Sequence, residues 1–213
     1  MLTVHHLGKS QSERIVWLCE ELAIAYRLVI YTRDPVTMLS PPGLKALSPT
    51  GSAPVITEGE IVLAESGAIV DYIIAKYGTG RLIFGPDHSD FPSYLYWLHF
   101  ANGTLQPAMG RNMILNRLKL ADDNPVALAM RGRLERALAL VEARLSQTDY
   151  LAGSEFTTAD IMTVFSLTTM RLFMPLDPTP YPHILTYLQR IGARPAYQRA
   201  MAKGDPGMVP MLT

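Results

Sequence analysis

Two short segments of the chain carry residues suited to holding a charged ligand: the turn 51–55, which contains Ala53-Pro54, and the pair Glu65-Ser66 ahead of an apolar-periodic helix. An X-Pro bond between two strand-like runs is a candidate cis peptide, because proline lowers the trans preference to about 0.5 to 1 kcal/mol. Such a bend would turn the main chain of Ala53 toward solvent as an edge that an extended peptide could join. Ser66 and its helix N-terminus would hydrogen-bond a carboxylate, and Glu65 would attract an amine. We therefore expect a small peptide ligand carrying both charges.

The segments that position these residues follow the order β-α-β-α-β-β-α over residues 1–79. Predicted strands cover 2–6, 27–31, 54–57 and 61–63, and predicted helices cover 12–23, 42–47 and 66–77. The first helix places Ile15, Leu18, Cys19 and Leu22 on one face at helical spacing. We expect a small α/β domain with a four-stranded mixed sheet.

After a polar linker, 80–90, strand signals disappear and helical patterns take over to the C-terminus. Thr157 and Asp160 have the spacing of a capping box, and the proline-rich run 174–182 is expected to be a loop. The predicted domain 91–213 is therefore an all-α bundle. Four apolar stripes would form its interior: Tyr94, Trp97, Leu98, Ala101 and Leu105; Leu134, Leu138, Val141 and Leu145; Ile161, Phe165, Thr168 and Leu172; Ile184, Leu188 and Ile191.

Composition argues against several function classes. The 213 residues suffice for two modest domains, and 19 basic side chains balance 19 acidic ones, so we expect neither nucleic acid nor a membrane as a partner. A single cysteine leaves no intrachain disulfide framework. No apolar run reaches the roughly 20 residues needed to span a bilayer, and no cationic leader opens the chain. A cytoplasmic location is expected.

Several fragments, in this order, resemble the cytosolic glutathione transferases: 6–18, 47–55, 65–69, 156–161 and 194–197. The runs 17–22 and 40–45 look most like the serine-type bacterial and fungal branch, in which helix 1 begins after a serine. The likeness covers nearly the whole chain. It implies a thioredoxin-like first domain, glutathione as cosubstrate and a homodimer.

The chemistry that the resemblance implies is stabilisation of a thiolate, because a free thiol with a pKa of roughly 8.5 is mostly protonated near neutral pH. Lowering that pKa by two units takes about 2.7 kcal/mol. The N-terminus of the first helix would contribute about 0.3 to 1 kcal/mol. A hydroxyl hydrogen bond to the anion, about 1.5 to 3 kcal/mol, would supply the rest. Ser10, four residues before Arg14 as in the family's motif, is the expected donor.

Ser12 is the alternative donor, although serine at this position is also typical of an ordinary helix N-cap. Arg14 is expected to be a surface or interdomain ion-pair partner. His5 and His6 are adjacent on a strand and should point to opposite faces, so they are interpreted as structural and no metal site is expected. Cys19 lies on the apolar helix face and is interpreted as buried and inert.

By the same resemblance, Ala53 should pair with the cysteinyl part of glutathione, and Glu65 and Ser66 should hold the γ-glutamyl amine and carboxylate. A plain helix N-cap is the other interpretation of Ser66. Ser52 stands where many relatives have a long basic or amide side chain directed toward the glycyl carboxylate. Recognition of that carboxylate is therefore expected to be weaker, water-mediated or supplied by another residue.

The expected function is a glutathione transferase that conjugates glutathione to apolar electrophiles or reduces organic hydroperoxides. The hydrophobic electrophile could bind among soft or apolar side chains, which could equally belong to the bundle core: Gln106, Met109, Met113, Met170 and Phe173. Two alternatives stay open. One is a noncatalytic member of the fold that binds glutathione, hydrophobic ligands or proteins, and the other is a glutathione-dependent isomerase or dehalogenase.

Overall fold

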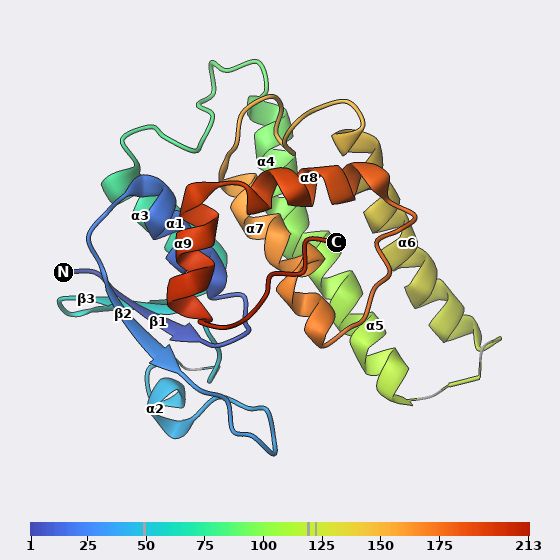
Figure 1. Ribbon diagram of the computed structural model, residues 1–213, viewed down its shortest axis with the longest axis horizontal. Helices are drawn as coiled ribbons and strands as arrows, with labels where there is room; N and C mark the ends of the chain where they lie inside the picture. Colours follow the sequence, from blue (N-terminus) through green and yellow to red (C-terminus); the bar gives the residue numbers. More distant parts are fainter. Residues whose placement is uncertain (49, 119, 122) are drawn as a thin grey trace. The chain divides into compact units, whose positions relative to one another are not determined.

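The computed structural model describes residues 1–48, 50–118, 120–121 and 123–213, whose helices and strands are drawn in Figure 1. Contacts divide the chain into two compact units. One unit holds residues 1–82 and 192–210, and the other holds residues 83–191 and 211–213. The domain boundaries expected from sequence, with a linker at 80–90, stay a prediction.

The first unit is built on a four-stranded mixed sheet in the order β2-β1-β3-β4. β1 (Thr3–Leu7) pairs in parallel with β2 (Arg27–Tyr31) and antiparallel with β3 (Val55–Glu58), which pairs antiparallel with β4 (Ile61–Ala64). The parallel pair needs a crossover, and α1 (Glu13–Leu22) supplies it. The predicted strand and helix order is confirmed: β2 has the predicted bounds, and the ends of the other strands differ from the prediction by at most one residue.

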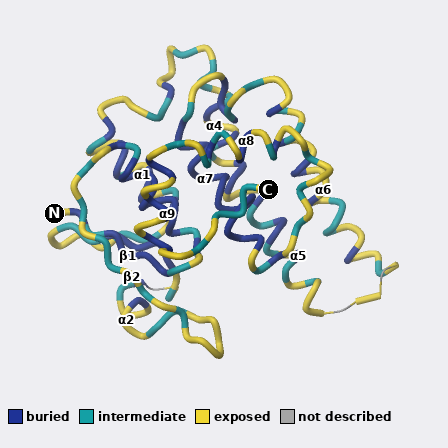
Figure 2. The backbone as a smooth tube through the Cα atoms, viewed as in Figure 1, coloured by how far each residue is buried: buried dark blue, intermediate teal, exposed yellow. Residues whose placement is uncertain are grey.

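Helices lie on both sides of this sheet. α1 and α3 (Ser66–Ile73), which continues as a π-helical turn, η1 (Ile74–Gly78), pack on each other and on the strands. α2 (Pro42–Lys45) lies on the other side of the strands in Figure 1, where Leu44 joins a buried cluster with Leu7 and Val55. Figure 2 shows β1 and α1 as mostly buried, whereas the residues of β2 and β4 are intermediate or exposed.

The first unit also contains α9 (Pro195–Gly204), which packs against α1. Glu20 of α1 accepts hydrogen bonds from Arg199 and Lys203 at 3.0 and 2.5 Å, and Glu21 pairs with Arg194 at 2.7 Å. The side chains of Glu20 and Glu21 are largely buried, which strengthens these pairs relative to fully exposed ones. Because α9 is fixed to α1, the residues that follow it lie beside β1.

The described residues of the second unit form helices and connecting loops, and none of them lies in a strand. The unit contains α4 (Phe91–Phe100), the π-helical turn η2 (Ala101–Leu105), α5 (Gln106–Leu118), α6 (Pro125–Leu145), α7 (Thr158–Leu167), the 3-10 turn η3 (Thr169–Leu172) and α8 (Pro182–Gly192). α4 packs on α7, and α5 packs on α6. The predicted capping box begins α7: the Asp160 carboxylate accepts the Thr157 amide at 2.9 Å, and the Thr157 hydroxyl accepts the Ala159 amide.

One predicted stripe ends earlier than expected. Ile161, Phe165 and Thr168 are buried, but Leu172 is 45% exposed. α7 ends at Leu167, and the 3-10 turn that follows has three residues per turn, so Leu172 no longer shares the face of Phe165. The segment after this turn is a loop, as predicted, until α8 begins at Pro182.

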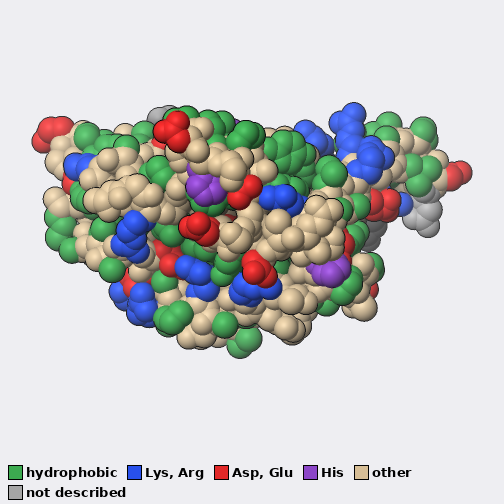
Figure 3. Space-filling model, turned by 90° about the horizontal axis from the view of Figure 1, so that it is seen from above, with side chains coloured by type: hydrophobic (Ala, Val, Ile, Leu, Met, Phe, Trp, Pro, Cys, Tyr) green, Lys and Arg blue, Asp and Glu red, His purple; other side chains and the backbone are tan. Residues whose placement is uncertain are grey.

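Charges of both signs are mixed on the surface. Basic and acidic side chains lie interspersed on the face shown in Figure 3, in keeping with equal numbers in the sequence. Among the described residues, no helix is both long enough and apolar enough to span a bilayer.

Candidate active site

The hydroxyls of Ser10 and Ser12 lie side by side in the loop between β1 and α1. Their Oγ atoms are 2.7 Å apart, and the Ser12 amide donates to Ser10 Oγ at 3.2 Å. Both serines are buried, with 6% and 0% of their surface exposed. The two candidate thiolate donors are thus hydrogen-bonded to each other rather than independent.

Ser12 occupies the N-cap position of α1, but its side chain does not cap the helix. Its Oγ accepts a hydrogen bond from the Leu7 amide at 3.0 Å and lies 2.9 Å from His6 Nδ1. The interpretation of Ser12 as an ordinary capping side chain is wrong, because its hydroxyl turns back toward β1 instead of toward the first amides of α1.

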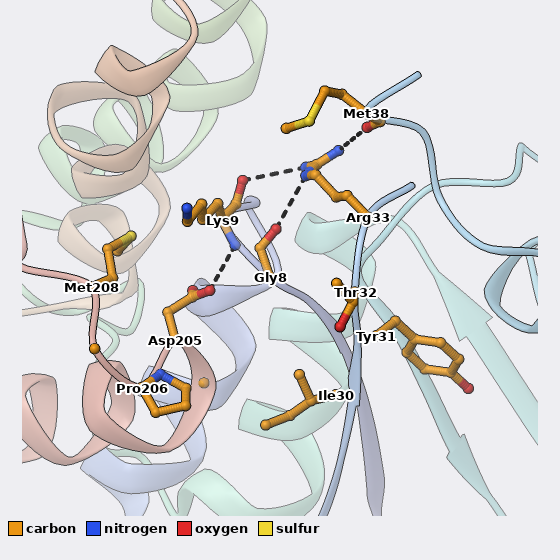
Figure 4. Close-up of a pocket in the computed structure, with 12 residues that line it drawn as sticks. Gly8, Lys9, Ile30, Tyr31, Thr32, Arg33, Met38, Asp205, Pro206 and Met208 are labelled. Atoms are coloured by element: carbon orange, nitrogen blue, oxygen red, sulfur yellow. Dashed lines mark hydrogen bonds between the residues drawn. The ribbon is translucent and has the colours of Figure 1, made fainter. Parts of the chain in front are cut away.

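The His6 ring joins this loop to the end of α9. Its Nε2 lies 3.2 Å from Oδ2 of Asp205, whose Oδ1 accepts the Lys9 amide at 2.8 Å. Figure 4 shows Asp205 directed at Lys9. No local sequence pattern could have indicated this contact, since His6 and Asp205 are 199 residues apart.

His5 faces the other side of the sheet. Its ring nitrogens lie 3.0 Å from the Tyr31 hydroxyl and 3.1 Å from Thr57 Oγ1. Burial, with a smaller contribution from Arg27, lowers the pKa of His5. Among the described residues, no group of three or more His, Cys, Asp or Glu side chains could hold a metal ion.

The predicted cis bond is present between Ala53 and Pro54. The carbonyl of Ala53, however, accepts a hydrogen bond from Gln11 Nε2 at 3.1 Å, and Ala53 is buried. The expectation that this main chain faces solvent as an open edge is therefore wrong. A carbonyl oxygen has two lone pairs, so one remains for a ligand.

Ser52 is exposed, with its Oγ 2.6 Å from Thr50 Oγ1. Before it, Gly51 has a φ of +66°, and a Cβ there would lie 3.2 Å from Lys45 Cγ. The aliphatic stem of Lys45 therefore runs along the proline turn. Pro49, part of the predicted fragment 47–55, lies outside the described residues.

Glu65 and Ser66 lie at the start of α3. The capping interpretation made Ser66 the N-cap, but the helix begins one residue earlier than that. Glu65 is the N-cap residue and Ser66 is the first helical residue, so Ser66 is not a plain N-cap. Glu65 has φ 71° and ψ 115°, a conformation that costs a non-glycine residue about 1 to 3 kcal/mol. Strain of this kind concentrates at ligand sites.

Arg14 links the loop before α1 to the start of α3, and through Gln11 to the turn at Ala53. This role was not predicted from the sequence. Its guanidinium donates from Nη1 to Gln11 Oε1 at 3.1 Å and to Ser66 Oγ at 3.4 Å. The side chain is fully buried, and this burial lowers its pKa to about 9, against a smaller opposing effect of Glu13. The surface position expected for Arg14 is wrong, because its side chain is buried and supports the site from within.

A pocket of about 540 Å³ opens beside the loop that carries Ser10. Figure 4 shows its lining residues, among which Ile30, Met38 and Met208 supply apolar surface. Arg33 holds the wall together by donating to the carbonyls of Gly8, Met38 and Lys9. A volume of this size suits a small organic ligand.

Comparisons with known proteins identify the family. The sequence profiles of the glutathione S-transferase N-terminal and C-terminal domains match residues 10–76 and 90–195. Glutathione S-transferase 3 of Zea mays is 32% identical over 167 residues, covering 76% of this chain and 75% of that protein. The chain belongs to the glutathione S-transferase family.

Other members of the glutathione S-transferase family match over almost the whole chain. Glutathione S-transferase 3 of Schizosaccharomyces pombe is 28% identical and covers 100% of this chain and 92% of its own length. The crystal structure of a glutathione S-transferase from Actinobacillus pleuropneumoniae is 32% identical, with a TM-score of 0.87 over 96% of this chain and 93% of that one. The thioredoxin-like first unit and helical second unit are those of this family.

Cys19 is a core residue of α1. It is fully buried in α1, and burial, reinforced by Glu20, raises the pKa of its thiol to about 12. A thiol that keeps its proton is neither a nucleophile nor a redox group at neutral pH. The prediction that Cys19 is buried is confirmed, and its inertness stays a prediction.

Proposed function

We propose that this glutathione transferase, which uses glutathione as its cosubstrate, belongs to the serine-type branch and activates glutathione as a thiolate at Ser10. The observation that carries the proposal is the buried pair of serine hydroxyls at the start of α1. One hydroxyl proton and the positive end of the helix are available there to an anion. Ser12 remains the alternative donor.

The γ-glutamyl end of glutathione is assigned to the start of α3. Glu65 would pair with its amine, and Ser66 with the first amides of the helix would hold its carboxylate. Arg14 supports this assignment, because a buried guanidinium beside Ser66 adds positive charge behind the carboxylate site.

The cysteinyl part is assigned to the main chain of Ala53, sharing the carbonyl with Gln11. Ser52 is the candidate contact for the glycyl carboxylate, and Lys45 adds a cation beside the same turn. A hydroxyl alone binds a carboxylate less strongly than a charged donor, so Lys45 would supply the positive charge that Ser52 lacks.

The second substrate is assigned to the apolar pocket beside the Ser10 loop. An electrophile held against Met38 and Met208 would lie next to the thiolate, and methionine adapts to varied apolar shapes. The thiolate would form a thioether with the electrophile, either by addition or by displacing a leaving group. With an organic hydroperoxide it would attack the peroxide oxygen and break the O–O bond, giving an alcohol and a glutathione sulfenic acid that a second glutathione converts to the disulfide and water. A turnover screen of both substrate classes with glutathione separates the two reactions.

A cytoplasmic homodimer is the proposed state of the protein. β4 is an edge strand, and its residues Ile61 and Val62, which point to opposite faces of the sheet, are 43% and 54% exposed. Apolar side chains on an open sheet edge favour association, and a second copy of the chain is the proposed partner.

Calorimetric titration of the wild-type protein with glutathione tests the assignment of the binding site. Binding should be measurable, and Glu65→Ala and Ser66→Ala should each weaken it about tenfold or more, since each removes a hydrogen bond to a charged group worth about 1.5 to 3 kcal/mol. Glu60→Ala, which removes an exposed acid in the β3–β4 turn, should leave the affinity unchanged. Wild-type protein without detectable binding would overturn the proposal.

A further inference from the structure

Four buried side chains form one continuous hydrogen-bonded chain from the loop before α1 to the end of α9. Ser10 Oγ is 2.7 Å from Ser12 Oγ, which is 2.9 Å from His6 Nδ1, and His6 Nε2 is 3.2 Å from Asp205 Oδ2. None of the four residues is more than 8% exposed. Water has little access to these groups, so each must find its partner within the chain.

We propose that His6 and Asp205 are positioning residues for glutathione activation: the chain Ser10–Ser12–His6 carries the thiol proton inward, and Asp205 stabilises the imidazolium that results. This inference rests on the proposed function, which puts the glutathione sulfur against Ser10. It concerns where the proton goes when the thiolate forms.

The resting arrangement follows from counting donors and acceptors. A carboxylate only accepts, so Asp205 holds the His6 tautomer with its proton on Nε2 and leaves Nδ1 as an acceptor. The Ser12 hydroxyl has two acceptors within reach, His6 Nδ1 at 2.9 Å and the Leu7 carbonyl at 3.3 Å, and it donates to the nearer one, Nδ1. Ser12 Oγ itself accepts from the Leu7 amide and from the Ser10 hydroxyl, which fills both of its lone pairs.

Proton transfer reverses the direction of the hydrogen bonds from Ser10 to Ser12 and from Ser12 to His6, and every donor still has an acceptor. The S–H bond breaks and its proton passes to Ser10 Oγ, while the Ser10 proton moves to Ser12 Oγ and the Ser12 proton moves to Nδ1 of His6. The electron pair stays on sulfur. Ser10 Oγ now accepts from the amide and the hydroxyl of Ser12, so its own proton must point outward to the thiolate.

The residues around His6 and Asp205 fit the proposed positioning role. A Cβ at Gly204 would come within 3.2 Å of His6 Nε2, and a Cβ at Gly8 within 3.2 Å of Asp205 Oδ1, so glycine at both places leaves room for the pair. Besides His6, Asp205 faces the amide of Lys9 and the charge of Arg33. The carboxylate of Asp205 is thus held in place between Lys9 and His6.

Ultraviolet titration of the thiolate of glutathione bound to His6→Asn tests the proposal. Asparagine keeps an acceptor for Ser12 but cannot take up a proton, so the thiol pKa of bound glutathione should rise by about one unit, a tenfold smaller thiolate fraction. Asp205→Asn, which keeps a side chain of the same shape without its charge, should raise that pKa in the same direction. His5→Asn, the adjacent residue on the opposite face, is the matched control and should not change it.

A second measurement follows the proton itself and does not depend on variant stability alone. Calorimetry of glutathione binding in buffers of different ionisation heat should show fewer protons released per thiolate formed by the wild type than by either variant. Unchanged thiol pKa values in folded His6→Asn and Asp205→Asn, with normal glutathione binding, would overturn the relay and leave the proposed function standing. A wild type that does not bind glutathione would overturn both. If His6→Asn does not fold, the test rests on Asp205→Asn and on the number of protons that the wild type releases to the buffer. Release of one full proton per thiolate formed would contradict the relay.

Discussion

At the residue scale, the candidate site combines side chains that the sequence indicated with others that it hid. Ser10, Ala53 and Ser66 stand in short fragments whose order along the chain resembles a known family, so they could be named in advance. Arg14 stands in the same fragment as Ser10, but its burial was not predicted, because an arginine in a first helical turn is usually exposed. Asp205 had no local signal, since its contact with His6 depends on where α9 packs.

Glu65 gives a test of backbone strain at the site. Its φ of 71° disfavours any residue with a Cβ. Glu65→Gly should therefore be more stable than Glu65→Ala by about 1 kcal/mol in the free energy of unfolding, the reverse of the usual order in helices. Chemical denaturation of the two variants measures the difference. Both variants lose the carboxylate and should bind glutathione equally weakly. An alanine variant more stable than the glycine variant would contradict backbone strain at Glu65.

At the element scale, hydrophobic spacing and capping residues predicted most helices and strands, because these signals are local. The end of α7 was missed for a physical reason: Thr168 leaves helical geometry, and the following 3-10 turn changes the period of the apolar side chains. The grouping of α9 with the first unit was also hidden, since it depends on ion pairs between residues far apart in the sequence, such as Glu20 and Arg199.

The capping box of α7 predicts a pH dependence of stability. The Asp160 carboxylate is fully buried, and burial raises its pKa to about 6, while donors that include the Leu151 amide and the Tyr187 hydroxyl oppose the shift. The folded state therefore keeps a proton between about pH 4 and 6 that the unfolded chain has released, so stability should fall as the pH rises through this window. A shift of two units corresponds to about 3 kcal/mol.

Denaturation of the wild type and Asp160→Asn at several pH values from 4 to 7 checks this sign. The asparagine variant is expected to start less stable, because its amide cannot accept all the donors, and to lack the decline between pH 4 and 6. A wild type whose stability rises through that window, relative to the variant, would show that Asp160 is ionised in the folded state well below pH 6.

At the scale of the whole molecule, the open edge of β4 predicts self-association. Light scattering should give a molar mass twice that of the 23.6 kDa chain. Val62→Glu puts a charge on the edge strand and should shift the protein toward the monomer, whereas Val36→Glu, at a loop residue that is 89% exposed, should not. A wild-type monomer at all concentrations would contradict the proposed dimer.

The balanced charge of the chain, with 19 basic and 19 acidic side chains, suits small-molecule partners such as glutathione. The element types of both units were predictable, because they follow from local periodicity, but the membership of α9 in the first unit was not. The second substrate was not, because it depends on the shape and lining of a pocket assembled from distant loops.

The most direct test of the account is the thiol pKa of glutathione bound to wild type, Ser10→Ala and Ser12→Ala, measured by thiolate absorbance against pH. The wild type should lower this pKa below that of free glutathione. Ser10→Ala should raise it again by about one to two units, because it removes the hydrogen bond to sulfur, and Ser12→Ala should raise it less. A larger effect of Ser12→Ala would assign the thiolate to Ser12, and no lowering in the wild type would contradict thiolate activation at this site.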